Sequence, residues 1–101
     1  MIPVNRPWLD EREAAFLQEA LASGWISGKG PFVSRFEKEW AGLCERRHGV
    51  AVCNGTAALE TAIYALELPH GSRVLMPVFS IIACLSAVVR NGLKPVFVDA
   101  D

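Results

Sequence analysis

The 101-residue sequence lacks the features that mark membrane, secreted and nucleic-acid-binding proteins. No apolar run reaches the roughly 20 residues of a membrane-spanning helix, and the longest, residues 74–89, is broken by Pro77, Ser80 and Ser86. The N-terminus lacks the charged-then-apolar order of a secretory signal. Ten basic and eleven acidic residues leave a net charge of −1, so no basic surface for nucleic acid is indicated. We therefore predict a globular domain with neither a membrane nor a nucleic-acid partner.

Cysteine is also scarce, and its spacing excludes the common cysteine-based sites. Cys44, Cys53 and Cys84 form no CxxC motif, and each lies in an apolar periodic segment. This pattern predicts buried free thiols in a reducing compartment rather than a disulfide framework or a zinc site. We therefore predict no metal site and a cytoplasmic location.

The first half of the chain has the pattern of two helices joined by a glycine-rich loop. Asp10 followed by Glu13 three residues later is typical of a capping box, and Gly24 predicts the end of that helix. A second helix is expected from Pro31, because proline suits the first helical position. In the loop between them, Trp25 is interpreted as an aromatic side chain packed into the core.

After Gly49 the pattern changes to short apolar strands that alternate with helices. The expected strands are residues 50–53, 73–76 and 95–98, and the expected helices are residues 56–68 and 80–90. Strands without polar alternation, joined through helices, indicate a parallel sheet with helices on both faces. We therefore predict an α/β fold, with residues 1–49 as an N-terminal helical segment and residues 50–101 as the start of a larger, incomplete α/β domain.

The junction between the first expected strand and its helix carries the clearest chemical signal. A β-branched apolar run stops at Asn54-Gly55-Thr56, and an Ala/Leu-rich stretch follows at once. A helix N-terminus presents free backbone N–H groups and about half a positive charge, so it favours an anion such as phosphate. Gly55 would let the ligand approach the backbone, and Thr56 would add a hydroxyl donor. An ordinary turn with Asn54 or Thr56 as the N-cap is equally compatible with the pattern.

The same geometry predicts where the site lies in the fold. In open parallel sheets, ligands bind outside the carboxyl ends of the strands. Asn54, Phe79 and Asp99 each follow an expected strand directly or within a few residues. We therefore expect all three at the same, functional edge of the sheet.

Four motifs then occur in a fixed order along the chain. They are Gly24-Trp25-Ile26-Ser27-Gly28 with Gly30-Pro31 and Phe36-Glu37, Cys53-Asn54-Gly55-Thr56-Ala57-Ala58-Leu59, Met76-Pro77 with Ala83, and Lys94-Pro95-Val96-Phe97-Val98-Asp99. In this order they resemble the DegT/DnrJ/EryC1/StrS family of sugar aminotransferases, which use pyridoxal 5′-phosphate (PLP). The resemblance covers nearly the whole chain. It implies the N-terminal part of the large, PLP-binding domain of the aspartate-aminotransferase fold (PLP fold type I).

The resemblance also implies roles for individual residues. The backbone N–H groups of Thr56 and Ala57, which follow Gly55, would hold the PLP phosphate. The loop that contains Ser27 and Gly28 would lie near the active site and contact the substrate. A homodimer is implied as well, with this loop close to its interface.

The segment after the second expected strand would lie against the cofactor ring. Most members of the family carry an aromatic residue at the position of Ile81, so Ile81 would contact the ring while Phe79 packs in the core. Alternatively, Phe79 would replace the missing aromatic residue. Ser80 would place a hydroxyl near the phosphate or the ring, or would instead cap the following helix.

The resemblance implies an enzyme that moves an amino group, from glutamate, to C4 of a nucleotide-linked keto sugar, in polysaccharide biosynthesis such as that of O-antigen. No catalytic residue is expected within this chain, because Lys29, Lys38 and Lys94 do not match the lysine that binds PLP in the family. The isolated 101 residues should therefore be inactive. Two alternatives stay open: a PLP-dependent sugar dehydratase, and a non-catalytic phosphate-binding α/β module.

Overall fold

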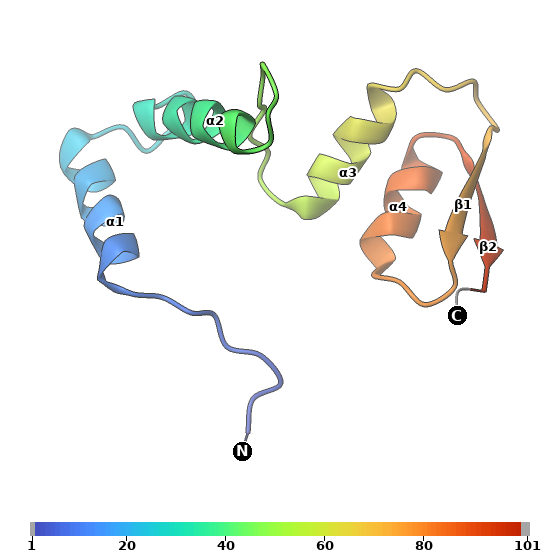
Figure 1. Ribbon diagram of the computed structural model, residues 1–101, viewed down its shortest axis with the longest axis horizontal. Coiled ribbons are helices and arrows are strands. Elements are labelled where there is room, and N and C mark those ends of the chain that lie inside the picture. Colours follow the sequence, from blue (N-terminus) through green and yellow to red (C-terminus); the bar gives the residue numbers. More distant parts are fainter. Residues whose placement is uncertain (1, 100–101) are drawn as a thin grey trace. The chain divides into compact units, whose positions relative to one another are not determined.

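A computed structural model describes residues 2–99 of the chain (Figure 1). Its elements, in order, are α1 (Glu11–Ser23), α2 (Pro31–Leu43), α3 (Gly55–Tyr64), β1 (Arg73–Pro77), α4 (Ile82–Arg90) and β2 (Lys94–Val98). The chain divides into two compact units, Met1–Ala51 and Val52–Asp101, which are described separately. No helix among the described residues is long and apolar enough to cross a membrane.

In the first unit, α1 begins and ends at the predicted residues. The Asp10 carboxylate accepts a hydrogen bond from the Arg12 N–H at 2.8 Å, and the Glu13 carboxylate accepts one from the Asp10 N–H at 2.7 Å. The Asp10 side chain also accepts the backbone N–H of Glu13, and this bond and the Glu13 bond together form the predicted capping box. At the other end, Gly24 has a φ of 71° and donates its N–H to the Leu21 carbonyl, which satisfies the open helix end.

The second helix of this unit, α2, also starts at the predicted proline. Pro31 is its first residue and Gly30 its N-cap. Its one buried residue is Ala41, while Phe36 and Trp40 stack on its surface with ring centroids 5.8 Å apart. The prediction that Trp25 packs into the core is wrong, because 56% of this residue is exposed. The loop is held by local hydrogen bonds instead, including one from the Trp25 N–H to the Ser23 hydroxyl.

The second unit is a parallel two-stranded sheet with two packed helices. The strands β1 and β2 pair in register, with Leu75 opposite Val96, and α4 forms the crossover between them. The helices α3 and α4 pack against each other, and α4 also contacts β2. The buried side chains of this unit are Met76, Ala87, Val88 and Leu93. The predicted α/β class with parallel strands and helices is therefore confirmed.

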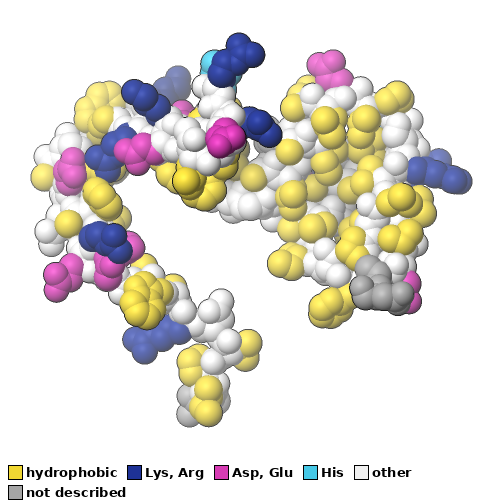
Figure 2. All heavy atoms as spheres, in the orientation of Figure 1, with side chains coloured by type: hydrophobic (Ala, Val, Ile, Leu, Met, Phe, Trp, Pro, Cys, Tyr) yellow, Lys and Arg dark blue, Asp and Glu magenta, His cyan; other side chains and the backbone are white. Residues whose placement is uncertain are grey.

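The described helices cover one face of this sheet. Met76 is 7% exposed, whereas its neighbour Leu75, on the opposite face of the strand, is 71% exposed. A second layer of helices over that opposite face is not formed by residues 2–99. Hydrophobic side chains, drawn in yellow, are accordingly numerous on the surface of the second unit (Figure 2).

The predicted strand at residues 50–53 does not form. This segment has no neighbouring strand among the described residues, so its backbone forms no ladder. The helix predicted to reach Leu68 ends at Tyr64, and a left-handed residue, Glu67 with a φ of 49°, lies in the turns that follow. That helix has no fully buried residue, although an almost wholly apolar sequence predicts burial on several sides.

The prediction of three buried cysteines is also wrong. Cys44 and Cys53 are exposed, and Cys84 is half-buried. Cys44 follows the end of α2, and Cys53 lies in the unpaired segment before α3, so neither is in an element that is covered on both sides. The apolar pattern around these cysteines therefore did not predict whether their side chains are buried.

Candidate functional site

The functional edge predicted from the sequence lies at one end of the second unit. Both strands end there, and the crossover helix α4 begins there (Figure 1). The N-terminus of α3 lies at the same end, because α3 runs in the same direction as α4. Phe79 follows β1 by two residues and Asp99 follows β2 directly. The arrangement therefore brings two helix N-termini to the carboxyl ends of two parallel strands, where α/β proteins bind ligands.

The first turn of α3 has one amide that is capped and two that are open. Asn54 is the N-cap, and its side-chain oxygen accepts the Ala57 N–H at 2.9 Å. The Ala58 N–H donates to the Asn54 carbonyl at 3.1 Å. No described residue accepts the N–H groups of Gly55 and Thr56. Of the two predicted phosphate donors, Thr56 is thus available, whereas Ala57 is already bound to the cap.

The space next to Gly55 fits an anionic group. A Cβ atom built on this glycine meets no atom within 4 Å. Thr56 is half-buried, and its hydroxyl lies on the residue whose amide is open. Open N–H groups, the positive end of a helix dipole and free space are what a phosphate ester needs. The residues present here therefore fit the phosphate of PLP.

The segment after β1 lines an apolar pocket at the same edge. The pocket has a volume of about 320 Å³, and its lining includes Met76, Ser80, Ile81, Leu85 and Phe97. Ile81 is 75% exposed, so a planar ring could pack against it without displacing other side chains. Its role as the ring contact stays a prediction.

Two expectations for this segment are wrong. Phe79 was expected in the core, but it is fully exposed at 100%, because it lies in the turn between β1 and α4 with no element above it. Ser80 was considered as the cap of the next helix, but α4 begins one residue later than that would require. Its N-cap is Ile81, which has no side-chain hydrogen bond to the helix. The Ser80 hydroxyl is therefore not used as a cap.

The residues predicted to contact substrate lie in the other unit. Ser27 and Gly28 are exposed, and the Ser27 carbonyl accepts the Gly30 N–H at 3.1 Å in a tight turn. This turn precedes α2 directly. Contact between these residues and a substrate stays a prediction.

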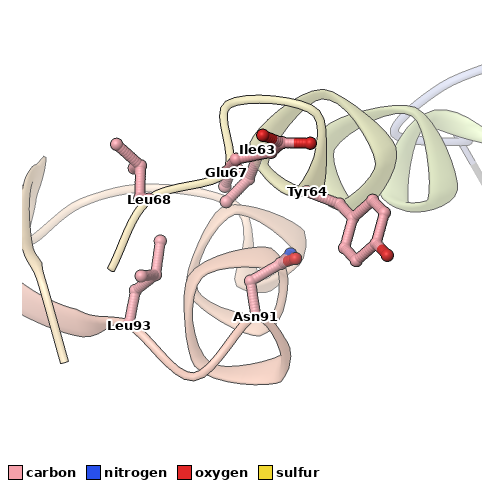
Figure 3. A pocket seen from close by; sticks show the side chains of 6 residues that line it. All are labelled: Ile63, Tyr64, Glu67, Leu68, Asn91 and Leu93. Atoms are coloured by element: carbon pink, nitrogen blue, oxygen red, sulfur yellow. The ribbon is translucent and has the colours of Figure 1, made fainter. Parts of the chain in front are cut away.

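A second pocket, not predicted from the sequence, lies at the opposite end of the second unit (Figure 3). It has a volume of about 220 Å³ and is lined by Ile63, Tyr64, Glu67, Leu68, Asn91 and Leu93. The Asn91 amide donates to the carbonyls of Ala87 at 2.8 Å and Glu60 at 3.2 Å, and so links α4 to α3. Sequence patterns identified Asn91 only as a helix end, because its contact with Glu60 spans 31 positions.

Among the described residues of the second unit, neither a cluster of metal-ligating residues nor a lysine lies at the functional edge. Residues 2–99 contain no group of three or more His, Cys, Asp or Glu side chains that could hold a metal ion. Lys94 is the first residue of β2, at the end of the sheet away from the edge. Lys29 and Lys38 belong to the first unit. What the described edge offers is two open helix amides and an apolar surface.

Comparison with known proteins identifies the family. A family model for DegT/DnrJ/EryC1/StrS aminotransferases matches residues 7–101. GDP-perosamine synthase of Vibrio cholerae is 39% identical over 101 residues, which is 100% of this chain and 28% of that protein.

Solved structures agree. NtdA from Bacillus subtilis with bound PMP matches with a TM-score of 0.80 at 33% identity, over 90% of this chain and 21% of that one. Escherichia coli GDP-4-keto-6-deoxy-D-mannose-3-dehydratase with bound hydrated PLP matches with a TM-score of 0.88 at 26% identity. The match covers 98% of this chain and 27% of that one. The chain thus spans between a fifth and a third of the length of these proteins. It belongs to the DegT/DnrJ/EryC1/StrS aminotransferase family.

Proposed function

We propose that this chain provides the phosphate-anchoring segment of a PLP-dependent sugar aminotransferase. The observation that carries the proposal is the pair of open amides at Gly55 and Thr56, at the carboxyl edge of a parallel sheet. Membership of an aminotransferase family supports it, as does similarity to structures that contain PLP and PMP.

Each residue at the edge then has a physical task. The amides of Gly55 and Thr56, aided by the α3 dipole and the Thr56 hydroxyl, bind the phosphate dianion. Asn54 keeps the first turn of the helix in place by accepting the Ala57 N–H. Ile81 offers an apolar contact to the ring, and Ser80 a further hydroxyl. When bound, PLP supplies the electron sink for transamination, and the protein supplies binding and orientation.

The proposed substrates are a nucleotide-linked keto sugar and an amino donor. The name of the Vibrio cholerae relative, GDP-perosamine synthase, supports a nucleotide-linked sugar. We further propose amination at C4, glutamate as the donor, a homodimer in the cytoplasm, and substrate contact by Ser27 and Gly28. Product analysis of the enzyme with glutamate and GDP-linked 4-keto sugars tests the chemistry.

One observation favours a second function. A dehydratase with bound hydrated PLP matches with a TM-score of 0.88, the same score as a putative sugar aminotransferase from Streptococcus pneumoniae in its PLP form. A sugar dehydratase would use the same phosphate anchor, so the residues described here fit both reactions. In the product analysis, a deoxygenated keto sugar would support dehydration, and an amino sugar would support transamination.

The phosphate anchor itself is tested by equilibrium binding. The probe is pyridoxamine 5′-phosphate, because it cannot form an imine with surface lysines, and pyridoxamine without phosphate measures the ring alone. Gly55→Val should weaken binding at least tenfold, since its side chain fills the space beside the open amides.

Gly42→Val is the matched control, because Gly42 is also helical and a Cβ there also meets no atom within 4 Å. Equal affinity of Gly55→Val and Gly42→Val, with both proteins folded, would contradict the phosphate assignment. Equal affinity of the wild type for pyridoxamine and its phosphate would do so as well.

A further inference from the structure

Glu37 makes a long-range contact that the proposed function does not yet use. This residue lies in α2, is half-buried, and belongs to the Phe36-Glu37 motif of the sequence. Its carboxylate Oε1 accepts the backbone N–H of Ala51 at 2.8 Å, across 14 positions of the chain. A hydrogen bond from an amide to a carboxylate is stronger than one between neutral groups.

A second contact holds the same segment against the same residue. A Cβ atom built on Gly49 would lie 2.6 Å from the backbone oxygen of Glu37 and 3.4 Å from the Ala41 Cβ. The backbone at Gly49 therefore approaches α2 so closely that only glycine fits without a shift. Two contacts, at Gly49 and at Ala51, thus fix residues 49–51 on Glu37.

The anchored segment is the one predicted as a strand. Ala51 has no ladder partner among residues 2–99, so the Glu37 carboxylate takes the place of a neighbouring strand's carbonyl. A backbone N–H that is half-buried without such a partner would be costly. The Glu37 carboxylate therefore accepts the Ala51 N–H, which would otherwise have no hydrogen-bond partner because this segment forms no β-ladder.

The anchor ends immediately before the phosphate site. Ala51 and the N-cap Asn54 are three residues apart, which limits their separation to about 10 Å. Only Val52 and Cys53 lie between them. Holding Ala51 reduces the number of conformations that the chain can adopt as it enters the first turn of α3, and so reduces the entropy that must be lost when an anion is bound.

We propose that Glu37 is a positioning residue for the phosphate site: its carboxylate holds Ala51 so that the segment leading to Asn54, Gly55 and Thr56 is preorganised. The role rests on the proposed function, since it assumes that a phosphate binds at these amides. Glu37 itself touches neither cofactor nor substrate in this account.

The test compares three variants of the chain. Glu37→Ala removes the acceptor, Glu37→Gln keeps an oxygen at the same place, and Glu39→Ala removes a carboxylate from the same helix that is exposed and pairs only with Arg35, at 3.8 Å. Hydrogen exchange of the Ala51 amide, followed by NMR, reports the anchor. The dissociation constant for pyridoxamine 5′-phosphate reports the site.

Glu37→Ala should speed exchange at Ala51 and weaken binding of the probe about tenfold, because without the anchor only about a tenth of the molecules would hold the segment in its binding-competent arrangement. Glu37→Gln should restore both values to within about threefold of the wild type, because its amide oxygen still accepts. Glu39→Ala should change neither. If Glu37 only stabilised the fold, Glu37→Ala would lower the free energy of unfolding, but Glu37→Gln would not restore the affinity for the probe.

Three results would overturn the positioning role. They are unchanged affinity in Glu37→Ala despite faster Ala51 exchange, an equal loss in Glu39→Ala, and failure of Glu37→Gln to restore binding. If the wild type itself does not bind the probe, the proposed function fails, and the Ala51 exchange rates still show whether the anchor exists. Should Glu37→Ala not fold, Gly49→Ala replaces it, because it displaces the same segment while keeping the carboxylate.

Discussion

The two units of the chain are stabilised by different kinds of interaction. In the first, α1 has no buried residue and depends on side chains that cap its own ends. In the second, α4 carries Ala87 and Val88, which are 0% and 3% exposed, and packs on both a helix and a strand. The comparison shows that local signals suffice to delimit a helix, whereas the functional edge depends on packing between elements far apart in the sequence.

The largest effect is expected in the core of the second unit. Met76→Ala should lower the free energy of unfolding by about 2–5 kcal/mol, because it removes a buried side chain and leaves a cavity. Leu75→Ala, in the same strand and 71% exposed, is the control and should cost much less. Urea unfolding followed by circular dichroism measures both. Equal losses would show that the two faces of the sheet are equally packed.

A smaller effect is expected at the link between α3 and α4. Asn91→Ala removes the donor to two carbonyls, and should cost about 1–3 kcal/mol. Arg90→Ala removes the ion pair between Arg90 and Glu60. Because the Arg90 side chain is 71% exposed, this change should lower the free energy of unfolding by less than about 1 kcal/mol. The same unfolding measurement ranks them. The reverse order would mean that the charged pair, not the amide, joins these helices.

The first unit should respond only locally. Asp10→Ala removes the cap of α1 and should destabilise that helix. Amide hydrogen exchange should become faster in Glu11–Ser23 while residues 73–98 keep their protection. A loss of protection in both places would contradict the division of the chain into separately stabilised units.

The smallest effect is a dependence of α1 on pH. Hydrogen bonds from Arg12 hold the pKa of the Asp10 carboxyl below its ordinary value of 3.8. Because the folded-state pKa is lowered, the ionised cap stabilises α1 at pH values above 3.8, and this stabilisation is lost as the pH falls through the lowered pKa. Circular dichroism should show a small loss of helix below pH 3.8 in the wild type. Asp10→Ala should lack this step.

The sequence was sufficient to predict those features of the fold that depend on residues close together in the chain. Asp10, Gly24 and Pro31 marked helix ends correctly because caps and turns act over three or four positions. The apolar segments of β1 and β2 were also found, since fully apolar strands joined by a helix favour parallel pairing.

Burial and partner choice were not predictable in the same way. The segment 50–53 has strand composition, but whether it pairs depends on a neighbouring strand that no local pattern reveals. The exposure of Phe79 and Cys53 likewise depends on which elements lie above them. At the candidate site, Gly55 and the N-cap of α3 could be predicted from the sequence, whereas the contact between Glu37 and Ala51 could not.

The turns at the far end of the second unit constrain it in a further way. The Gly71 N–H donates to the Gly92 carbonyl at 2.9 Å, and Gly92 adopts a φ of 71°. A Cβ at position 92 would lie 2.5 Å from the His70 Cδ2 atom, so a side chain there would require this exposed ring to move and would also be strained by the positive φ. Position 92 is therefore restricted by its backbone conformation, whereas Phe79 and Ile81, at the other end of the strands, are exposed and can be replaced without loss of packing. Substitutions at the proposed site should therefore change ligand binding with little effect on the pairing of β1 and β2.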